Sequence, residues 1–281
     1  MHSLQLVSHS DDSRYIPVTS FQVWAGVDSR SVSSLNIVSD SRISWGEHHR
    51  WDQGRKVYAA QAQPHIAGYW GDVAFPALAL PQFLDQVNFG LLEARSTEEW
   101  KKLLVEKLRG LWRTYPDEEK RNFGVAHGYR LGSGMRCQFG LTILSYNRRS
   151  DRFNAVSVSM PSTSAILHIE GSGASSLRTS HIRWNESEHS GTSRAAFAGF
   201  CDSIQSGEDP YTGGSPQIVS LYRDRGGQMI GTVTMRKRHF GGAPIDKLSS
   251  TSPVEWRNEL FERVDGQSKR RLPGAQRHKP L

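Results

Sequence analysis

The sequence predicts an α+β fold in which paired strands build sandwiched antiparallel sheets and helices pack outside them. Segments rich in β-branched and aromatic residues occur in pairs joined by short polar turns, which is typical of hairpins. Between these pairs lie segments with helical spacing of apolar residues. The order is strand pairs, helices, strand pairs, a helix and a strand pair, so strands and helices do not alternate as in a parallel βαβ sheet.

The strand pairs are expected at four places along the chain. The first joins TSFQVWAGV (19–27) to LNIVSD (35–40) through a polar turn, and KVYAAQ and HIAGYWG follow between 56 and 71. A hairpin around NRRSDR joins residues 137–147 to 152–160. The strand-like run ILHIE stands before residue 171, and the last pair lies within 217–240.

Four helices are expected. Residues 74–94 are predicted to be helical with an interruption at Pro81, and residues 97–116 carry the clearest helical stripe, which includes Trp100 and Leu104. Residues 193–205 form a third helix. PVEWRNELFERV (253–264) is predicted to be a short amphipathic helix, followed by a basic C-terminal tail.

Composition limits the classes of function. The chain has 281 residues and a formal charge of +7, and its tail SKRRLPGAQRHKPL carries basic residues and no acid. We expect a solvated tail there, with nucleic-acid association through it as an alternative. Two cysteines, Cys137 and Cys201, favour a reducing compartment and core positions. Neither a signal peptide nor a membrane span is predicted, so we expect a cytoplasmic protein with no membrane partner.

Five short motifs carry residues suited to nucleophilic chemistry. Thr19 opens the first strand, Asp-Ser-Arg (40–42) follows the second, and Lys56 comes 16 residues after Asp40. Gly71 ends Ile-Ala-Gly-Tyr-Trp-Gly, 15 residues after Lys56. Gly-Ser-Gly (171–173) and Asp-Pro-Tyr-Thr-Gly-Gly (209–214) come later.

The residue types fit acyl transfer. A threonine hydroxyl is a poor nucleophile at neutral pH unless a base and a cation stand beside it. A free terminal amine can be that base, and a buried Lys56 needs a carboxylate such as Asp40. A developing oxyanion needs a backbone N–H, which a glycine such as Gly71 can bring close.

In this order the motifs resemble the proteasome β-type family and the bacterial proteasome-like peptidases of the N-terminal-nucleophile hydrolase superfamily. The resemblance runs from residue 19 to about residue 235. It implies a four-layer αββα sandwich of two antiparallel sheets flanked by helices, with residues 1–18 as a flexible extension or prosegment, 19–240 as the domain and 241–281 as a helix and tail. It also implies a peptidase that assembles into rings or stacks and acts on peptides or unfolded proteins without cofactor or metal. Whether an ATPase is its partner stays open.

The resemblance assigns a role to each matched residue. Thr19 would be the nucleophile, Asp40 would pair with Lys56, and the N–H of Gly71 would face the oxyanion. Ser172, Asp209 and Thr212 would support the α-amine and the proton path. The family usually has serine at the position of Thr212. Tyr69 and Trp70 would line the substrate pocket.

Other interpretations of these residues remain open. Eighteen residues precede Thr19, and Val18 stands where the family prefers glycine. Three interpretations follow: the extension is cleaved, it stays and leaves an inactive scaffold subunit, or translation begins at position 18. Ser20 is an alternative nucleophile. Asp40 and Lys56 could be a surface ion pair, Gly71 a tight turn, Ser172 a helix cap and residues 209–214 an ordinary turn. Neither a metal site at His48 and His49 nor a Ser-His-Asp site is favoured.

Overall fold

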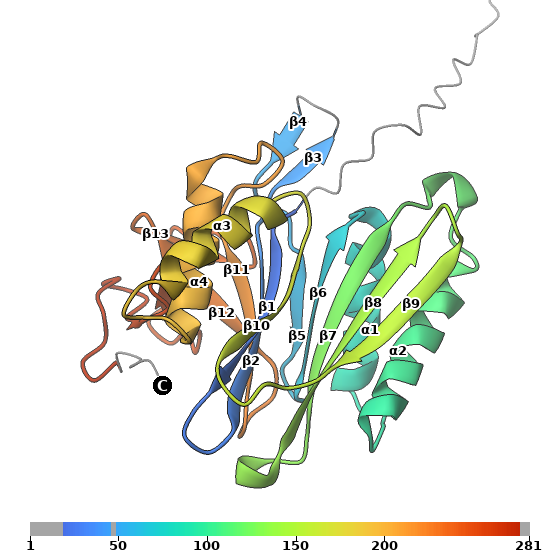
Figure 1. Cartoon of the computed structure of the whole chain (residues 1–281), viewed down its shortest axis with the longest axis horizontal. Coiled ribbons are helices and arrows are strands. Elements are labelled where there is room, and N and C mark those ends of the chain that lie inside the picture. Colours follow the sequence, from blue (N-terminus) through green and yellow to red (C-terminus); the bar gives the residue numbers. More distant parts are fainter. Residues whose placement is uncertain (1–18, 46–48, 276–281) are drawn as a thin grey trace, which may run out of the picture.

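The computed structural model describes residues 19–45 and 49–275. The predicted extension, residues 1–18, lies outside the described residues, as does the end of the basic tail, 276–281. Two large sheets stand side by side with a pair of helices beside each (Figure 1). None of the described helices is both long and apolar enough to cross a membrane.

The larger sheet has nine strands in the order β10-β1-β2-β11-β12-β13-β14, with β15 and β16 attached through β12. Its pairs are antiparallel except that β15 runs parallel to β12. The predicted hairpins β1–β2 and β11–β12 are both present. The strands are β1 (Phe21–Val27), β2 (Val32–Ser39), β10 (Ala165–Glu170), β11 (Gln217–Tyr222), β12 (Gln228–Thr234), β13 (Lys237–Phe240), β14 (Ala243–Pro244), β15 (Trp256–Asn258) and β16 (Arg263–Val264).

The smaller sheet has five antiparallel strands in the order β5-β6-β7-β8-β9. The predicted hairpin of β8 and β9 is present, and its central neighbour β7 was not predicted from the sequence. Strand β7 is buried along nearly its whole length, so it lacks the alternation of apolar and polar residues that marks a half-exposed strand. The strands are β5 (Val57–Ala60), β6 (His65–Gly71), β7 (Phe123–Leu131), β8 (Gln138–Asn147) and β9 (Arg152–Val158).

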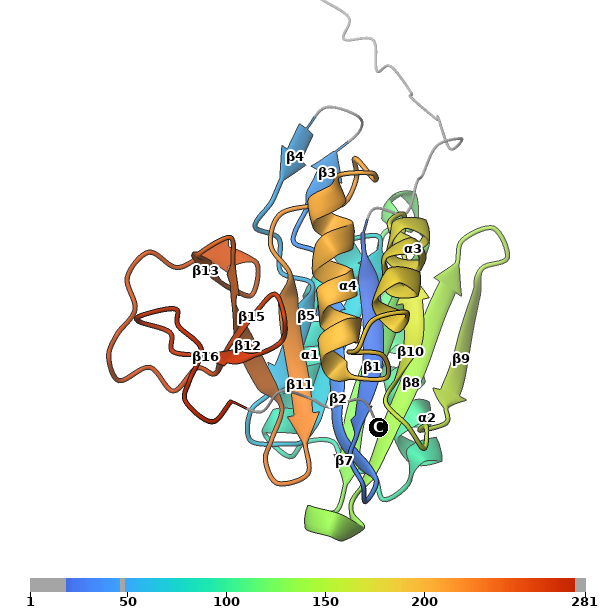
Figure 2. The same cartoon turned by 60° about the vertical axis from the view of Figure 1, so that its left-hand side comes forward.

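Helices α1 (Ala74–Asn88) and α2 (Thr97–Trp112) pack on the smaller sheet, and α3 (Ala174–Asn185) and α4 (Ser193–Ser206) pack beside β1 and β10 of the larger one (Figures 1 and 2). Pro81 does not interrupt α1. An interior proline usually destabilises a helix, but the residues that follow it, Phe83, Leu84 and Val87, are buried in the cluster against the smaller sheet. Short 3₁₀ turns lie at η1 (Asp117–Glu119) and η2 (Gly134–Arg136).

Three clusters of buried apolar side chains hold these elements together. The stripe of α2, Trp100, Leu104, Leu108 and Trp112, lies in the cluster between the helices α1 and α2 and the smaller sheet. Phe21 of β1 belongs to a second cluster formed by residues of both sheets. A third cluster joins the larger sheet to α3 and α4. Successive residues of β1 therefore point to opposite faces, as the pleat requires.

The C-terminal region corrects the sequence prediction. Residues 253–264 do not form a helix, because they contribute β15 and β16 to the larger sheet. Trp256 is buried with Val233 and Val264 in a small cluster of its own, and Arg194 of α4 holds Glu262 at 2.6 Å. Packing against β12 thus outweighs the helical spacing of this segment, so the chain after residue 240 extends the sheet.

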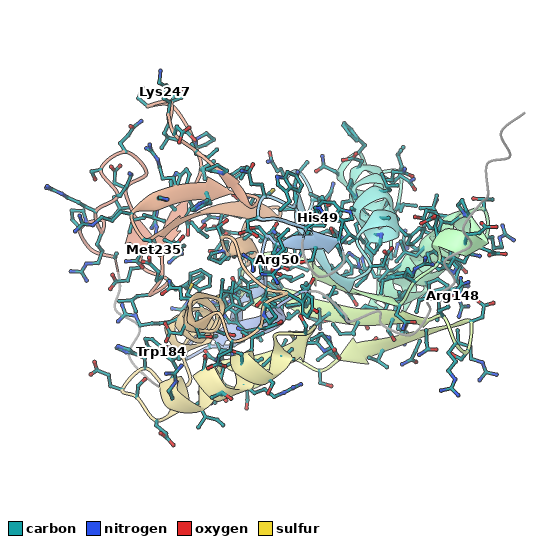
Figure 3. All side chains as sticks on the ribbon, turned by 90° about the horizontal axis from the view of Figure 1, so that it is seen from above. His49, Arg50, Arg148, Trp184, Met235 and Lys247 are labelled. Carbon is teal, nitrogen blue, oxygen red and sulfur yellow. The ribbon has the colours of Figure 1, made fainter. Side chains whose placement is uncertain are left out.

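A third, two-stranded sheet lies between two of the residues singled out from the sequence. It is the hairpin of β3 (Ile43–Trp45) and β4 (His49–Trp51), which stands between Asp40 and Lys56 in the sequence. Both ribbon views show it projecting beyond one end of the large sheets (Figures 1 and 2). Seen from above, its residues His49 and Arg50 lie near the centre of the view, between Arg148 and Lys247 at the two ends (Figure 3).

Candidate active site

Three of the residues singled out from the sequence meet in one buried contact. Thr19 lies just before β1, Asp40 just after β2 and Lys56 just before β5. The Lys56 Nζ atom donates hydrogen bonds to Thr19 Oγ1 at 3.1 Å and to Asp40 Oδ1 at 2.8 Å. All three residues have no exposed surface, so Asp40 and Lys56 are not the surface ion pair that the sequence left open.

The Asp40 carboxylate is held by backbone donors as well as by the lysine. Its Oδ1 accepts from the amide of Ser20, and its Oδ2 accepts from the amides of Arg42 and Gly213, each at 3.1 Å. Backbone N–H groups stabilise the ionised form of a carboxylate without adding a second buried charge. This arrangement fixes the carboxylate facing Lys56.

Burial acts on both members of the ion pair. It lowers the pKa of Lys56, and the Asp40 carboxylate opposes that shift. Burial also raises the pKa of Asp40, against the opposing effect of the Lys56 ammonium and of its backbone donors. Burial therefore moves the two pKa values toward each other.

The main chain of Thr19 is fixed by the turn that follows β10. The Thr19 amide donates to Ser172 Oγ at 3.3 Å, and the Thr19 carbonyl accepts from the Gly173 amide at 3.3 Å. Gly171 has φ +97°, and a Cβ there would lie 1.9 Å from the Thr19 carbonyl oxygen. A glycine is thus required beside Thr19. Ser172 contacts Thr19, whereas the N-cap of α3 is Gly173, without a side-chain cap.

Ser20 occupies a different environment from Thr19. Its hydroxyl is buried and has no hydrogen-bond partner among the described residues. A Cβ on Gly173 would lie 2.0 Å from Ser20 Oγ and 3.0 Å from a methyl carbon of Thr212. Because the Ser20 side chain lies against Gly173 and the described contacts of Lys56 Nζ are to Thr19 and Asp40, the geometry does not support Ser20 as the nucleophile.

The segment 209–214 forms a turn that reaches the site through its backbone. The Asp209 carbonyl accepts from the Thr212 amide and hydroxyl, at 3.3 and 3.4 Å, and the Asp209 carboxylate accepts from the amide of Tyr211 at 2.9 Å. Gly213 then donates to Asp40. The described hydrogen bonds of the Asp209 and Thr212 side chains stay within this turn, so their predicted support of the Thr19 amine stays a prediction.

Gly71 lies at the end of β6, directly before the turn into α1. Its φ is +84°, and a Cβ there would lie 2.7 Å from the Asn122 carbonyl oxygen. The position therefore needs glycine for a backbone reason, as the tight-turn interpretation proposed. The role of its N–H toward an oxyanion stays a prediction.

Tyr69 and Trp70, which were predicted to line the substrate pocket, are both buried. Tyr69 has no exposed surface and lies in the cluster beneath α1 and α2, with its hydroxyl donating to the Arg55 carbonyl at 3.1 Å. Trp70 is 8% exposed, and its ring centroid lies 4.9 Å from those of Phe21 and His168. Successive residues of β6 point to opposite faces, so the two aromatic rings fill two different cores.

Two residues that support the site, Arg42 and Asp52, were not among the candidates predicted from the sequence. Arg42 binds Asp52 through two hydrogen bonds, of 2.7 and 2.9 Å, and donates to the carbonyls of Pro210 and Thr212 at 3.1 and 2.9 Å. Because Arg42 belongs to the Asp-Ser-Arg motif, the sequence could have indicated it, whereas no sequence pattern indicates Asp52. The described residues contain no group of three His, Cys, Asp or Glu side chains that could hold a metal ion. His48 lies outside the described residues.

Comparisons with known proteins were made against families, sequences and structures. No family model matches the sequence, and no curated protein matches it significantly. Anbu (ancestral beta-subunit) from Yersinia bercovieri matches in structure at 16% identity, covering 72% of this chain and 81% of its own, with a TM-score of 0.49. Eukaryotic HslV from Trypanosoma brucei matches at 12% identity over 73% of this chain and 99% of its own, with a TM-score of 0.45.

Thiobacillus denitrificans BPH in complex with epoxomicin matches at 12% identity over 73% of this chain and 99% of its own, with a TM-score of 0.47. Because each of these identities is low and each TM-score is below 0.5, activity has to be argued from the geometry of the site.

Proposed function

We propose that this protein is a threonine-type N-terminal-nucleophile amidohydrolase, most simply a peptidase, with Thr19 as its nucleophile. The observation that supports the proposal is the position of Lys56 Nζ, which touches both Thr19 Oγ1 and Asp40 Oδ1 with no exposure to solvent. A cation at this distance stabilises the developing negative charge of an attacking hydroxyl. A structural ion pair would not need a threonine hydroxyl as its third member.

The proposed reaction has two stages, the formation of an ester on Thr19 and its hydrolysis. Thr19 Oγ1 forms a bond to the carbonyl carbon of an amide while its proton passes to the free α-amine of Thr19, and the oxyanion is held by a backbone N–H, which we assign to Gly71. The C–N bond then breaks, and the leaving amine takes the proton. Water then adds to the carbonyl carbon of the resulting ester while the same amine takes its proton; the bond from that carbon to Thr19 Oγ1 breaks, and Oγ1 takes the proton from the amine, which releases the acid. Ser172, whose Oγ already lies 3.3 Å from the Thr19 nitrogen, would orient that amine.

This chemistry requires cleavage of the peptide bond between Val18 and Thr19. In the full chain the Thr19 nitrogen is an amide, which does not accept a proton at neutral pH. The contact of this nitrogen to Ser172 Oγ supports the proposal, because the same hydroxyl could orient the amine once it is free. We therefore propose that residues 1–18 act as a removable prosegment.

The experiment combines N-terminal sequencing with active-site labelling. Protein purified without an N-terminal tag from its native cells is analysed by intact mass, then treated with a peptide epoxyketone, which reacts with a hydroxyl and a free amine on the same residue. We expect a chain that begins at Thr19 and carries the label there, and we expect Thr19→Ala to take up none. An unlabelled chain that begins at Met1 would contradict the proposal and favour an inactive scaffold subunit.

Finer features of the resemblance belong to the same proposal. We propose that the two sheets and two helix pairs make the four-layer αββα sandwich of this superfamily, and that subunits assemble into rings or stacks in the cytoplasm. Substrates would be peptides or unfolded proteins. Sedimentation velocity of the purified protein measures the assembly, and a monomer at micromolar concentration would contradict it.

A further inference from the structure

A buried glutamine lies between the main chains of the two charged residues of the site. Gln217 is the first residue of β11 and is 1% exposed. Its Oε1 accepts from the Lys56 amide at 2.9 Å, and its Nε2 donates to the carbonyls of Asp40 at 2.9 Å and Gly54 at 2.8 Å. One side chain thus joins the backbone of Asp40 to that of Lys56.

The three hydrogen bonds determine the orientation of the amide. A glutamine offers two N–H donors on one side and a carbonyl acceptor on the other. The Lys56 partner is a donor, and the partners on Asp40 and Gly54 are acceptors, so a flipped amide would place like groups against each other at all three contacts. Both Nε2 hydrogens are used, which leaves the side chain no alternative position of equal energy.

The bridge matters because Asp40 and Lys56 come from separate segments. The chain between them includes the projecting hairpin of β3 and β4 (Figure 1). The contact between Lys56 Nζ and the Asp40 carboxylate joins only the ends of the two side chains. Gln217 fixes the points from which those side chains start, and it does so from β11, which pairs with β2 through Gln217 and Ser39.

We propose that Gln217 is a positioning residue for catalysis, which holds the backbones of Asp40 and Lys56 at the spacing that places Lys56 Nζ on the Thr19 hydroxyl. This inference rests on the proposed function. Gln217 touches neither the Thr19 hydroxyl nor the site of bond breaking through any described contact. It acts through the backbone, so its loss displaces the lysine while the residues that would bind a substrate remain.

The chain offers a matched control. Gln228 is likewise the first residue of its strand, β12, and its Nε2 also donates to two carbonyls, those of Gly226 and Gly227, at 3.2 and 3.3 Å. Those carbonyls lie in its own turn rather than in the site. Substituting either glutamine by methionine keeps the length of the side chain and removes its hydrogen bonds.

The test measures the kinetics of epoxyketone labelling on the processed protein. For Gln217→Met we expect the limiting labelling rate to fall by about 100-fold, the loss that a displacement of about 1 Å can cause, with the half-saturating probe concentration changed by less than about twofold. For Gln228→Met we expect both values to stay at the wild-type level. A Gln217→Met protein that labels at the wild-type rate would overturn the proposal, as would one in which only the half-saturating concentration changes.

A second measurement does not depend on activity. Hydrogen exchange of the Lys56 amide, followed by NMR, reports the contact to Gln217 Oε1 directly. We expect exchange at least about tenfold faster in Gln217→Met than in Gln228→Met or the wild type. If the wild-type protein takes up no label, the proposed function fails, and the exchange rate still decides whether Gln217 fixes Lys56. Unchanged exchange would overturn the positioning role.

Discussion

Lys56 Nζ lies 2.8 Å from Asp40 Oδ1, and neither side chain has any exposed surface. Such a pair is costly to bury and more costly to break, because the remaining charge has no partner. The pair therefore affects the stability of the fold, and this effect can be measured.

Removing the charge of Asp40 alone should destabilise the protein. We expect Asp40→Asn to lower the free energy of unfolding by about 3 kcal/mol, because it leaves the Lys56 ammonium buried without a counter-ion. Adding Lys56→Met to it should recover part of the loss. Urea denaturation of the two single variants and the double variant gives the coupling, and strictly additive losses would contradict a direct ion pair.

The turn beside Thr19 should not tolerate a side chain. Gly171→Ala places a Cβ against the Thr19 carbonyl oxygen and forces a positive φ on alanine. We expect a loss of about 3 kcal/mol from the clash and the backbone strain together. Gly191→Ala is the control, since Gly191 has φ +67° and no atom within 4 Å of a Cβ, so strain alone should cost about 1 kcal/mol. Equal losses in thermal or urea unfolding would rule out the clash.

A buried histidine pair should make stability depend on pH. His65 Nδ1 lies 3.0 Å from His127 Nε2, and burial lowers the pKa of His65 from 6.5 to about 3 and that of His127 well below 6.5. The folded state keeps both rings neutral, whereas the unfolded state binds protons below pH 6.5. Stability is therefore complete above pH 6.5 and is lost as the pH falls from there toward 3, by up to about 1.4 kcal/mol per pH unit for each ring.

The measurement is the free energy of unfolding between pH 7 and pH 4. We expect His65→Gln to flatten this dependence, because one group that protonates only on unfolding is gone, and the exposed His49→Gln to leave it as in the wild type. If the free energy of unfolding of His65→Gln falls with pH as steeply as that of the wild type, the histidine pair does not cause the loss of stability in acid.

The C-terminal strands should be part of the cooperative unit. Truncation after Phe240 removes β14–β16 and the buried Trp256, and we expect a loss of at least about 3 kcal/mol, the usual cost of deleting a buried tryptophan side chain. Truncation after Ala275 is the control and should leave the midpoint of urea unfolding unchanged. Equal midpoints for both truncations would mean that residues 241–275 are a dispensable tail.

Local patterns in the sequence determined most of the secondary structure. The stripe from Trp100 to Trp112 predicted α2 because a helix with one buried face repeats its apolar residues every three to four positions. The hairpins of β1 with β2 and of β8 with β9 were predicted for the corresponding reason. Strand β7, which is buried along nearly its whole length, carries no such local signature. The segment around Trp256 carries a helical pattern, but it forms strands because it packs against β12.

The ordered motifs, through the family that they resemble, predicted Thr19, Asp40 and Lys56 as candidate site residues. Only the tertiary structure decided that Thr19 rather than Ser20 meets Lys56, since the direction of each side chain depends on the pleat of β1 and on the turn at Gly173. It also placed Tyr69 and Trp70 in cores and brought Gln217, 161 residues from Lys56, against its amide. Contacts between distant segments depend on which strands pair and on how the layers pack, and these are properties of the whole fold rather than of a local pattern.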